Sequence, residues 1–504
     1  MTAHLYAQLA RHFDRDDRLA FLQPDGKSYS YGEVARGAAT YAQALVGLGV
    51  APGDRVAVQI EKSVDGVMLM LGCLRAGAVI LPLNTAYTAA EVDYFLRDAE
   101  PRVFICNPAR MDVRQAAQAA GVARIETMAA DSSGSISERA RLCPEIFADV
   151  ARGPDDLAAI VYTSGTTGRS KGAMLTQENL ASNARTLVAC WRFTQEDVLL
   201  HALPIYHVHG LFIAINTMLM AGGAMLFLPA FDADEIIRLM PRATAMMGVP
   251  TFYVRLLQHA GLTRAATRHM RLFISGSAPL LAETHRAFEE RTGHAILERY
   301  GMTETGMNTT NPYDGPRLPG TVGPPLPGVS LRVTDPESGA ALPQDETGMI
   351  EVKGPNVFAG YWRQPEKTRA EFRADGFFVT GDLGKIDSQG YVHIIGRAKD
   401  LIITGGLNVY PKEVETVIDS VPGVVESAVI GVPHPEFGEG VTAVVAIEAG
   451  ATVDEASILA ALADRLAKYK QPKRVVLVAQ LPRNTMGKVQ KNRLRDSYAR
   501  LYLK

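Results

Sequence analysis

The densest group of reactive side chains is the segment YTSGTTGRSKG, which runs from Tyr162 to Gly172. Its glycines permit backbone conformations and close approaches that other residues do not, and its hydroxyls and lysine supply hydrogen-bond donors. Such a loop is suited to wrapping an anion such as a polyphosphate. The spacing GxxxxGK[ST] is absent, which excludes a P-loop NTPase. A flexible Ser/Gly turn is the alternative. The residues predicted to bind phosphate are Thr163, Ser164, Gly165, Thr166, Thr167, Gly168, Arg169, Ser170 and Lys171.

The segment RYGMTET carries a second group with compatible chemistry. Tyr300 can stack on a base, Thr303 can donate to a phosphate, and Glu304 is a hard oxygen ligand of the kind that Mg²⁺ accepts beside phosphate oxygens. On its own this segment is weak evidence. It gains weight only in combination with the glycine-rich segment.

Three further residues could serve the same ligand. Asp382 in FFVTGDL could accept both hydroxyls of a ribose, and Arg397 in IIGRAKD could pair with phosphate. Lys488 follows a glycine in LPRNTMGKVQK. Taken singly, each residue also has an ordinary structural explanation. Asp382 could form a turn, Arg397 could be a surface arginine, and Lys488 could be a solvated lysine.

The elements that must position these residues belong to a globular chain. The chain has 504 residues, with 52 Lys+Arg against 54 Asp+Glu and 47% hydrophobic residues. This composition excludes a disordered or fibrous protein and predicts two or more domains. The near-neutral charge balance gives no reason to expect nucleic acid or a membrane surface as partner. We therefore expect small-molecule ligands.

The cysteines and the apolar segments indicate a cytoplasmic protein. Cys73, Cys106, Cys143 and Cys190 are far apart and contain no CxxC pair, so we interpret them as free thiols in a reducing compartment. The N-terminus lacks the apolar core of a signal peptide. The uncharged stretch 210–230 is interrupted by Asn216, two glycines and Pro229, which favours a buried helix, a turn and a buried strand over a membrane span.

Short apolar runs between helical patterns predict an α/β architecture with strands buried on both faces. These runs are RVAVQI, AVILPL, VFIC, AAIVYTS, AMLFLP, AMMGVP and LFISGS. Between about 320 and 396, short alternating segments predict a β-rich part. From 399 to 504 the order helix, strand, strand, helix, strand predicts a separate small α+β domain, so we place the domain boundary between 398 and 399.

The motifs taken in order resemble the adenylate-forming superfamily of acyl-CoA synthetases, adenylation domains and firefly-type luciferases. The resemblance rests on YTSGTTGRSKG, RYGMTE, GMIEVKG, FFVTGDL, GRAKDLIITGG with NVYPKEVE, and LPRNTMGKVQK, and it covers nearly the whole chain. It implies a large N-terminal domain with two α/β halves and a β-barrel-like part. It also implies a small C-terminal domain that swings on a hinge at Lys399.

The resemblance implies ATP and coenzyme A as co-substrates and Mg²⁺ as cofactor. The 163–172 loop would bind the β- and γ-phosphates, Tyr300 would lie against adenine, and Thr303 would contact the α-phosphate. Glu304, with Thr167, would bind Mg²⁺. Asp382 and Arg397 would bind the ribose, Lys488 would bridge the attacking carboxylate and the α-phosphate, and Gly405 and Gly406 would line the coenzyme A channel. The implied catalytic residues are Lys488, Glu304 and His207.

Within that superfamily, several segments are most similar to members that ligate malonate, a short diacid. These segments are LPLNTAYT, HALPIYHVHGLF, MGVPTFYVRLL, FISGSAPLL and RYGMTETGMNTTNPYDG. The second carboxylate of a diacid would stay charged in a closed pocket, so the pocket needs a cation or strong donors. The helical pattern alone places Arg255 opposite the apolar face, as a surface arginine, whereas the resemblance places it on the distal carboxylate. The acid-pocket residues are His207, Val208, His209, Arg255, Ser277, Gly306 and Met307.

Several alternatives stay open at this point. The acid could be another short carboxylic acid, with methylmalonate left undecided, and the acceptor could be a carrier protein. A nucleotide-binding sensor without catalysis, or an oxidative luciferase-like use of the adenylate, is disfavoured. The basic residues Lys468, Lys470, Lys473 and Arg474, with Arg483, Lys491 and Arg493 further on, could meet coenzyme A phosphates or form a solvated face. Acetylation of Lys488 is a further hypothesis.

Overall fold

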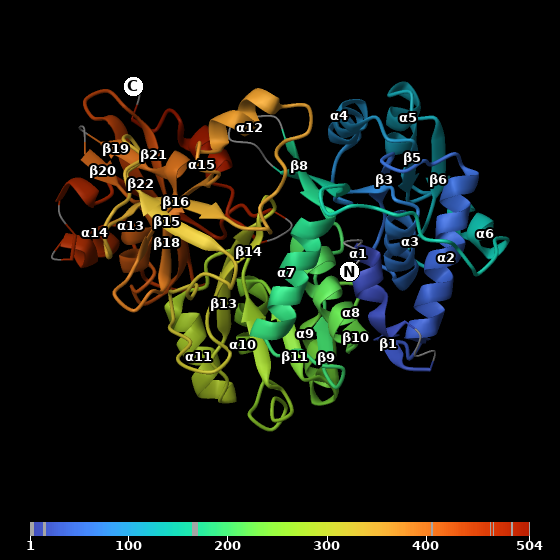
Figure 1. Cartoon of the computed structure of the whole chain (residues 1–504). Helices are drawn as coiled ribbons and strands as arrows, with labels where there is room; N and C mark the ends of the chain where they lie inside the picture. Colours follow the sequence, from blue (N-terminus) through green and yellow to red (C-terminus); the bar gives the residue numbers. More distant parts are fainter. Residues whose placement is uncertain are drawn as a thin grey trace. The chain divides into compact units, whose positions relative to one another are not determined.

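The computed structural model describes residues 5–13, 17–163, 170–404, 407–463, 465–466, 468–484 and 487–502 (Figure 1). The chain divides into two compact units. The large unit comprises Met1–Ser330 with Val352–Phe378, and the small unit comprises Leu331–Glu351 with Val379–Lys504. The small unit thus includes about half of the predicted β-rich part, which the sequence assigned to the N-terminal domain. The boundary at 398/399 stays a prediction.

A six-stranded sheet forms one half of the large unit, in the order β6-β5-β3-β4-β7-β8. Its pairings are parallel except for β7 with β8. The central strands are largely apolar and buried, as expected for a parallel sheet covered by helices. The strands are β3 (Arg55–Gln59), β4 (Val79–Pro82), β5 (Val103–Cys106), β6 (Arg124–Thr127), β7 (Leu157–Thr163) and β8 (Lys171–Thr176).

An eight-stranded sheet forms the other half, in the order β14-β13-β12-β11-β9-β10-β1-β2. Its six inner strands are parallel, and only the two edge strands are antiparallel to their neighbours. The strands are β1 (Leu19–Leu22), β2 (Ser28–Ser30), β9 (Val198–His201), β10 (Ala224–Phe227), β11 (Ala245–Gly248), β12 (Leu272–Ser275), β13 (Leu297–Met302) and β14 (Gly306–Thr310).

Helices cover both sheets, and three of the longer ones begin at a capping box. Ser30, Thr88 and Thr176 each accept a hydrogen bond from the backbone of the third helical residue, whose side chain bonds back to the cap. The helices are α1 (Leu5–Leu9), α2 (Tyr31–Gly47), α3 (Val64–Arg75), α4 (Ala89–Ala99), α5 (Met111–Ala119), α6 (Ser135–Arg141), α7 (Gln177–Cys190), α8 (Asn216–Ala221), α9 (Ala233–Leu239), α10 (Pro250–Gln258), α11 (Ala282–Thr292) and α12 (Pro365–Glu371), with short 3₁₀ turns at Ala10–His12 and Met240–Arg242.

The uncharged stretch 210–230 forms the predicted buried helix, turn and strand. The π-helical segment His209–Ile215 begins one residue before this stretch, and α8 and β10 follow it. Gly222, with φ of 76°, ends α8 in the left-handed conformation that allows the sharp turn. Within the described ranges, no helix combines the length and apolarity needed to cross a bilayer. The four cysteines are unpaired thiols.

The small unit contains most of a four-stranded sheet, β15-β16-β17-β18, and a five-stranded sheet in which β22 is central. Val429, Val441 and Ile418 belong to the core between the five-stranded sheet and its helices. The elements are β15 (Ser330–Thr334), β16 (Gly348–Lys353), β17 (Phe378–Ile386), β18 (Val392–Arg397), a 3₁₀ turn at Ala398–Asp400, β19 (Ile402–Thr404), β20 (Leu407–Val409), α13 (Pro411–Ile418), β21 (Val424–His434), β22 (Gly438–Ile447), α14 (Glu455–Ala463), a 3₁₀ turn at Lys468–Lys470, β23 (Arg474–Val478) and α15 (Lys491–Tyr498).

Candidate active site

The carboxyl ends of the parallel strands in the eight-stranded sheet bring several predicted residues to one edge. His207 and His209 follow β9, Ser277 follows β12, and Thr303 follows β13. Ligands of open α/β sheets bind outside the carboxyl ends of the strands. The topology therefore gathers residues that are far apart in sequence at the edge where a ligand site is expected.

The glycine-rich segment connects two strands whose ends are paired. Thr163 ends β7 and stands opposite Lys171, the first residue of β8. The carbonyl of Ser170 accepts a 2.9 Å hydrogen bond from the hydroxyl of Tyr94. The remaining predicted phosphate-binding residues, Ser164, Gly165, Thr166, Thr167, Gly168 and Arg169, lie outside the described residues.

Lys171 and Glu304 meet a network of buried polar groups. The ammonium of Lys171 lies 3.2 Å from Oε1 of Glu371. The hydroxyl of Tyr361 lies 2.7 Å from Oε2 of Glu371 and 3.2 Å from Oε1 of Glu304. Burial, together with the carboxylates of Glu304 and Glu371, raises the pKa of Tyr361, so the phenol keeps its proton. The network links the end of the glycine-rich segment to the predicted metal ligand.

The carboxylate of Glu304 has the chemistry that Mg²⁺ requires. Its Oε1 also lies 3.4 Å from the hydroxyl of Thr163, and its side chain is buried. Carboxylate and hydroxyl oxygens, completed by phosphate oxygens, form the hard donor set typical of Mg²⁺ bound to a nucleotide. These residues fit the predicted cation, whereas the second predicted ligand, Thr167, lies outside the described residues.

Tyr300 and Thr303 belong to the β13–β14 hairpin. Tyr300 is buried and pairs with Thr309 across the hairpin. Thr303 follows β13 and is half-buried. Glu304 is fixed through its carbonyl, which accepts a 2.8 Å hydrogen bond from the backbone of Phe358. The hairpin thus carries all three residues of RYGMTET that were predicted to contact the nucleotide or its Mg²⁺.

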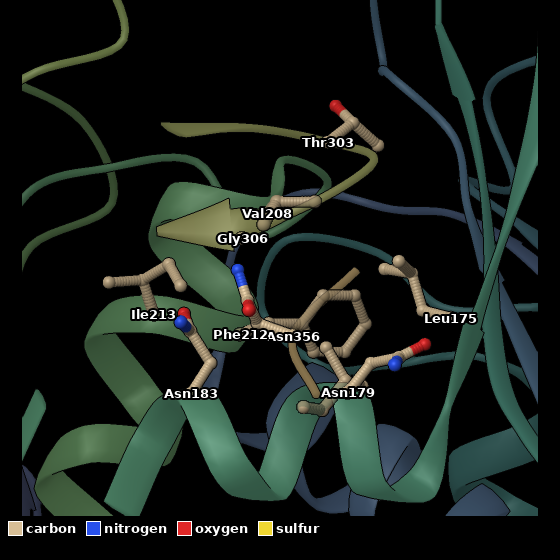
Figure 2. Close-up of a pocket in the computed structure, with 10 residues that line it drawn as sticks. Leu175, Asn179, Asn183, Val208, Phe212, Ile213, Thr303, Gly306 and Asn356 are labelled. Atoms are coloured by element: carbon tan, nitrogen blue, oxygen red, sulfur yellow. The ribbon is translucent and has the colours of Figure 1, made fainter. Parts of the chain in front are cut away.

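A small cavity lies beside this hairpin and has room for about one water molecule (Figure 2). Val208, Thr303 and Gly306, all predicted site residues, contribute to its wall. Figure 2 shows Asn179 and Asn183 of α7 below them in this view. The other lining residues are Leu175, Leu180, Phe212, Ile213 and Asn356.

Gly306 and Met307 are held tightly against α7. The side chain of Asn183 accepts a 3.1 Å hydrogen bond from the Met307 amide and donates one of 3.0 Å to the Met307 carbonyl. Gly306 has φ of 56°, and a Cβ there would lie 2.7 Å from Oδ1 of Asn183. Only glycine fits this position without displacing Asn183.

His207, His209 and Ser277 form a connected group. The backbone N–H of His209 donates to Nδ1 of His207 at 3.1 Å, and the hydroxyl of Ser277 lies 3.2 Å from Nδ1 of His209. Burial, with smaller contributions from Arg299 and His207, lowers the pKa of His209 well below its usual value, so its imidazole is neutral at neutral pH. Ser277 adopts a φ of 70°, a strained conformation of the kind that clusters at ligand sites.

The structure adds Arg299, a buried cation that the sequence prediction missed. Its side chain lies beneath Gly276, where a Cβ would come within 2.4 Å of the guanidinium carbon. Among the described residues, its Nε and Nη2 are buried and have no hydrogen-bond partner. Burial lowers the pKa of Arg299 to about 9, which leaves it charged at neutral pH. Because an unpaired buried charge is costly, this guanidinium is suited to an anionic ligand.

Arg255 is exposed on α10, and its guanidinium lies 5.7 Å from the ring centroid of Phe231. The opposite side of the helix carries Tyr253 and Leu256, which are buried in the core as the helical pattern predicts. The role of Arg255 on a distal carboxylate stays a prediction.

The neighbour of Arg299, Glu298, gives a test of the buried electrostatics of this strand. Burial raises the pKa of Glu298 to about 8, and the Gly320 N–H, which donates to Oε1 at 3.3 Å, offsets this effect only in part. From about pH 5 to 8 the unfolded chain releases this proton and the folded chain retains it, so the contribution to stability falls as pH rises. Glu298→Gln should remove this loss and be more stable than wild type at pH 8.5, by on the order of 3 kcal/mol.

Thermal unfolding of both proteins from pH 5 to 9 measures this difference. The melting temperatures should converge near pH 5 and separate as pH rises. Parallel curves across the whole range would show that the Glu298 carboxyl titrates normally. Other titrating groups are common to both proteins and cancel in the comparison.

In the small unit, Asp382 and Arg397 are cross-strand partners on β17 and β18. Nε of Arg397 lies 2.7 Å from Oδ1 of Asp382, whose side chain is buried. The guanidinium also donates to the carbonyl of Thr380 at 3.3 Å. The two residues predicted to bind ribose therefore form one ion-paired unit, which holds the carboxylate in a fixed orientation.

Lys488 is exposed, and its backbone is fixed within a turn. Its N–H donates to Oδ1 of Asn484 at 2.9 Å, and its carbonyl accepts from the Asn484 N–H at 2.9 Å. The predicted hinge residue Lys399 is exposed in the 3₁₀ turn after β18. The predicted channel residues Gly405 and Gly406 lie outside the described residues, between the paired strands β19 and β20.

Several of the basic residues between 468 and 493 that could meet coenzyme A form contacts inside the small unit. Lys470 lies 2.6 Å from Glu413, and Arg474 lies 3.2 Å from Glu455. The ammonium of Lys473 lies 3.7 Å from the ring centroid of Phe437. These contacts give three of the basic residues a structural role within the small unit. Binding of coenzyme A phosphates by these residues stays a prediction.

Comparison with known proteins places this fold in a family. The AMP-binding enzyme profile matches residues 9–362, and the profile of the AMP-binding enzyme C-terminal domain matches residues 413–488. The chain belongs to the AMP-binding enzyme family. This membership confirms the predicted adenylate-forming fold and the prediction of an ATP-dependent acyl-CoA ligase.

Relatives within this family act on different acids. The chain is 62% identical to MatB from Rhodopseudomonas palustris in an ATP-bound crystal structure, with a TM-score of 0.98 and 100% of both chains covered. It is 34% identical to a malonate–CoA ligase of Arabidopsis thaliana, over 95% of this chain and 86% of that protein. It is 35% identical to a feruloyl-CoA synthase from an Amycolatopsis species, over 94% of each chain.

Proposed function

We propose that this protein ligates malonate to coenzyme A through malonyl-adenylate, with AMP and pyrophosphate as the other products. Its similarity to a malonate–CoA ligase and to ATP-bound MatB supports the reaction. The observation that carries the choice of a diacid is Arg299, a buried and partly unpaired guanidinium beneath the Gly276–Ser277 turn. A monoacid would leave this cation without an anionic partner.

Residues from several parts of the chain would bind the nucleotide. The 163–171 segment binds the β- and γ-phosphates, Tyr300 lies against adenine, and Thr303 contacts the α-phosphate. Asp382 binds the ribose hydroxyls, with Arg397 holding its carboxylate by the 2.7 Å ion pair. Glu304, with Thr167, would hold Mg²⁺, which when bound neutralises phosphate charge.

The acid pocket is assigned to the carboxyl edge of the eight-stranded sheet. Ser277 and the two histidines supply hydrogen-bonding groups for the diacid, and Arg299 and Arg255 supply positive charge. His207 is proposed to orient the reacting carboxylate. Val208, Gly306 and Met307 lie near the carbon between the carboxylates, where the space that remains decides whether a methyl group is accepted.

The first half-reaction is a displacement at phosphorus. A carboxylate oxygen of malonate attacks the α-phosphorus, the bond from that phosphorus to the bridging oxygen breaks, and pyrophosphate leaves with the electron pair. Negative charge converges where the two reactants meet. We assign Lys488 to this point, because a mobile ammonium stabilises the converging oxygens.

In the second half-reaction the coenzyme A thiol attacks the adenylate carbonyl. The thiol loses its proton, a carbon–sulfur bond forms, and the carbon–oxygen bond to AMP breaks. Rotation of the small C-terminal domain about Lys399 would withdraw Lys488 and bring Gly405 and Gly406 to the channel. Acetylation of Lys488 would remove its charge and block the first half-reaction. The proposed location is the cytoplasm.

A panel of acids tests the substrate assignment. AMP formation from MgATP and coenzyme A is measured with acetate, propionate, malonate, methylmalonate, succinate, benzoate and ferulate. Malonate should give the highest kcat/KM, by at least about tenfold over the monoacids, because only a diacid pairs the buried guanidinium. Ferulate is included because a feruloyl-CoA synthase is among the relatives. A monoacid as best substrate would overturn the malonate assignment, and carrier-protein phosphopantetheine as the faster acceptor would overturn that of coenzyme A.

A further inference from the structure

Lys171, the final cation of the glycine-rich segment, has a protein carboxylate as its partner. Its side chain is only 7% exposed, and its ammonium lies 3.2 Å from Oε1 of Glu371. The ammonium also lies 4.7 Å from the ring centroid of Tyr361. A buried cation of a phosphate-binding segment is thus neutralised by the protein itself.

Glu371 remains anionic although it is half-buried. Burial alone would raise its pKa, but hydrogen bonds from Lys367 and Tyr361, with the charge of Lys171, outweigh this effect and lower the pKa of Glu371. Lys367 lies one turn earlier on α12, with its ammonium 2.8 Å from Oε1. Two lysines therefore share one carboxylate oxygen, and any change at Lys367 alters how strongly Glu371 attracts Lys171.

The backbone brings these residues together in a fixed register. The N–H of Trp362 donates to the carbonyl of Gly172 at 2.8 Å, and Met174 and Gly360 are joined by a 2.9 Å bond. The hydroxyl of Thr368 on α12 accepts a 2.9 Å hydrogen bond from the N–H of Tyr361. The segment that carries Glu371 is therefore anchored to the strand that carries Lys171.

We propose that Glu371 is an internal counter-anion for Lys171, which the phosphates of ATP must displace when the nucleotide binds. The inference rests on the proposed assignment of Lys171 to the ATP phosphates. Binding exchanges one ion pair for another, so the measured affinity for ATP reports the difference between the Lys171–phosphate and Lys171–Glu371 interactions. Glu371 weakens ATP binding in this way and keeps the buried ammonium ordered until the nucleotide arrives.

Two pairs of variants on α12 test the inference through ATP binding alone. The dissociation constant for ATP is measured by calorimetry in EDTA, without acid or coenzyme A. Glu371→Gln should lower it about tenfold relative to wild type, because Lys171 no longer has to leave a carboxylate. Glu366→Gln removes the same charge from an exposed position of the same helix and should change it less than about twofold.

The second pair should act in the opposite direction. Lys367→Met leaves Glu371 with Lys171 as its remaining lysine partner, so the dissociation constant should rise about fivefold. Arg369→Met removes the same charge from an exposed residue that does not contact Glu371, and its smaller effect gives the general electrostatic contribution.

Each outcome decides the inference. A dissociation constant that is unchanged or raised in Glu371→Gln overturns it, as does equality of Lys367→Met and Arg369→Met. If Glu371→Gln fails to fold, the lysine and arginine variants decide alone. If the wild-type protein binds no ATP, both this inference and the proposed function are overturned. If the wild-type protein binds ATP and the variants bind it with the same dissociation constant, only the inference is overturned.

Discussion

Replacing Lys488 by alanine should lower malonate-dependent exchange of pyrophosphate into ATP by about 10²-fold or more. The exchange reports the first half-reaction, in which the carboxylate and the α-phosphate bring negative charges together. Lys488 is exposed, and its backbone is fixed on both sides by Asn484, so its side chain can be removed without a cavity. The loss should therefore fall on the reaction and leave the melting temperature unchanged.

The second half-reaction provides the internal comparison for Lys488. With chemically prepared malonyl-adenylate and coenzyme A, Lys488→Ala should form thioester within about threefold of the wild-type rate, because the ammonium is needed only for adenylation. Lys385→Ala removes a lysine whose ammonium makes a 3.5 Å surface contact with Asp345 and should affect neither step. Equal losses in both half-reactions would show that Lys488 acts in folding or in general binding.

Replacing Arg299 by methionine should lower kcat/KM for malonate by about 10²-fold while activity with acetate is unchanged or raised. The methionine fills the volume of the side chain but leaves the distal carboxylate without its buried cation. Acetate has no second carboxylate and gains from a more apolar pocket. The measurement is AMP formation with each acid, with the melting temperature as the check on folding.

Arg255→Ala belongs in the same experiment, because the resemblance predicts that it too loses malonate activity. Arg255 is exposed on α10 and Arg299 is buried, so the two variants separate the two positions. Arg299→Lys keeps the charge and should recover part of the malonate activity. If only Arg255→Ala loses malonate activity, the distal carboxylate is bound at α10, and Arg299 serves the structure of the hairpin.

The architecture could be predicted because its signals are local. Runs such as VFIC and LFISGS are continuous and apolar, and each forms a buried parallel strand as predicted, namely β5 and β12. The break in the stretch 210–230 could also be predicted, because Asn216, two glycines and Pro229 interrupt it. In the structure one of these glycines, Gly222, has the positive φ that few other residues adopt. The π-helical segment at His209–Ile215 has no comparable signal in the sequence.

The details of the site depend on contacts that sequence spacing does not encode. Arg299 is the first residue of RYGMTET and belongs to strand β13. Only the fold shows that its guanidinium is buried against Gly276. A charged residue next to Glu298 in a strand of apolar neighbours was the available clue. Glu371 is separated from Lys171 by 200 residues, so no local pattern could pair them.

Malonate labelled with ¹⁸O in its carboxylates provides the most direct test of the acyl-adenylate account. A carboxylate oxygen that attacks the α-phosphorus stays on that phosphorus when coenzyme A displaces AMP, so each AMP should carry one ¹⁸O by mass spectrometry. The malonyl-CoA should correspondingly contain one ¹⁸O fewer than the labelled malonate. Unlabelled AMP together with labelled inorganic phosphate or pyrophosphate would place the attack at another phosphorus and contradict the adenylate mechanism proposed for Lys488, Glu304 and the glycine-rich segment.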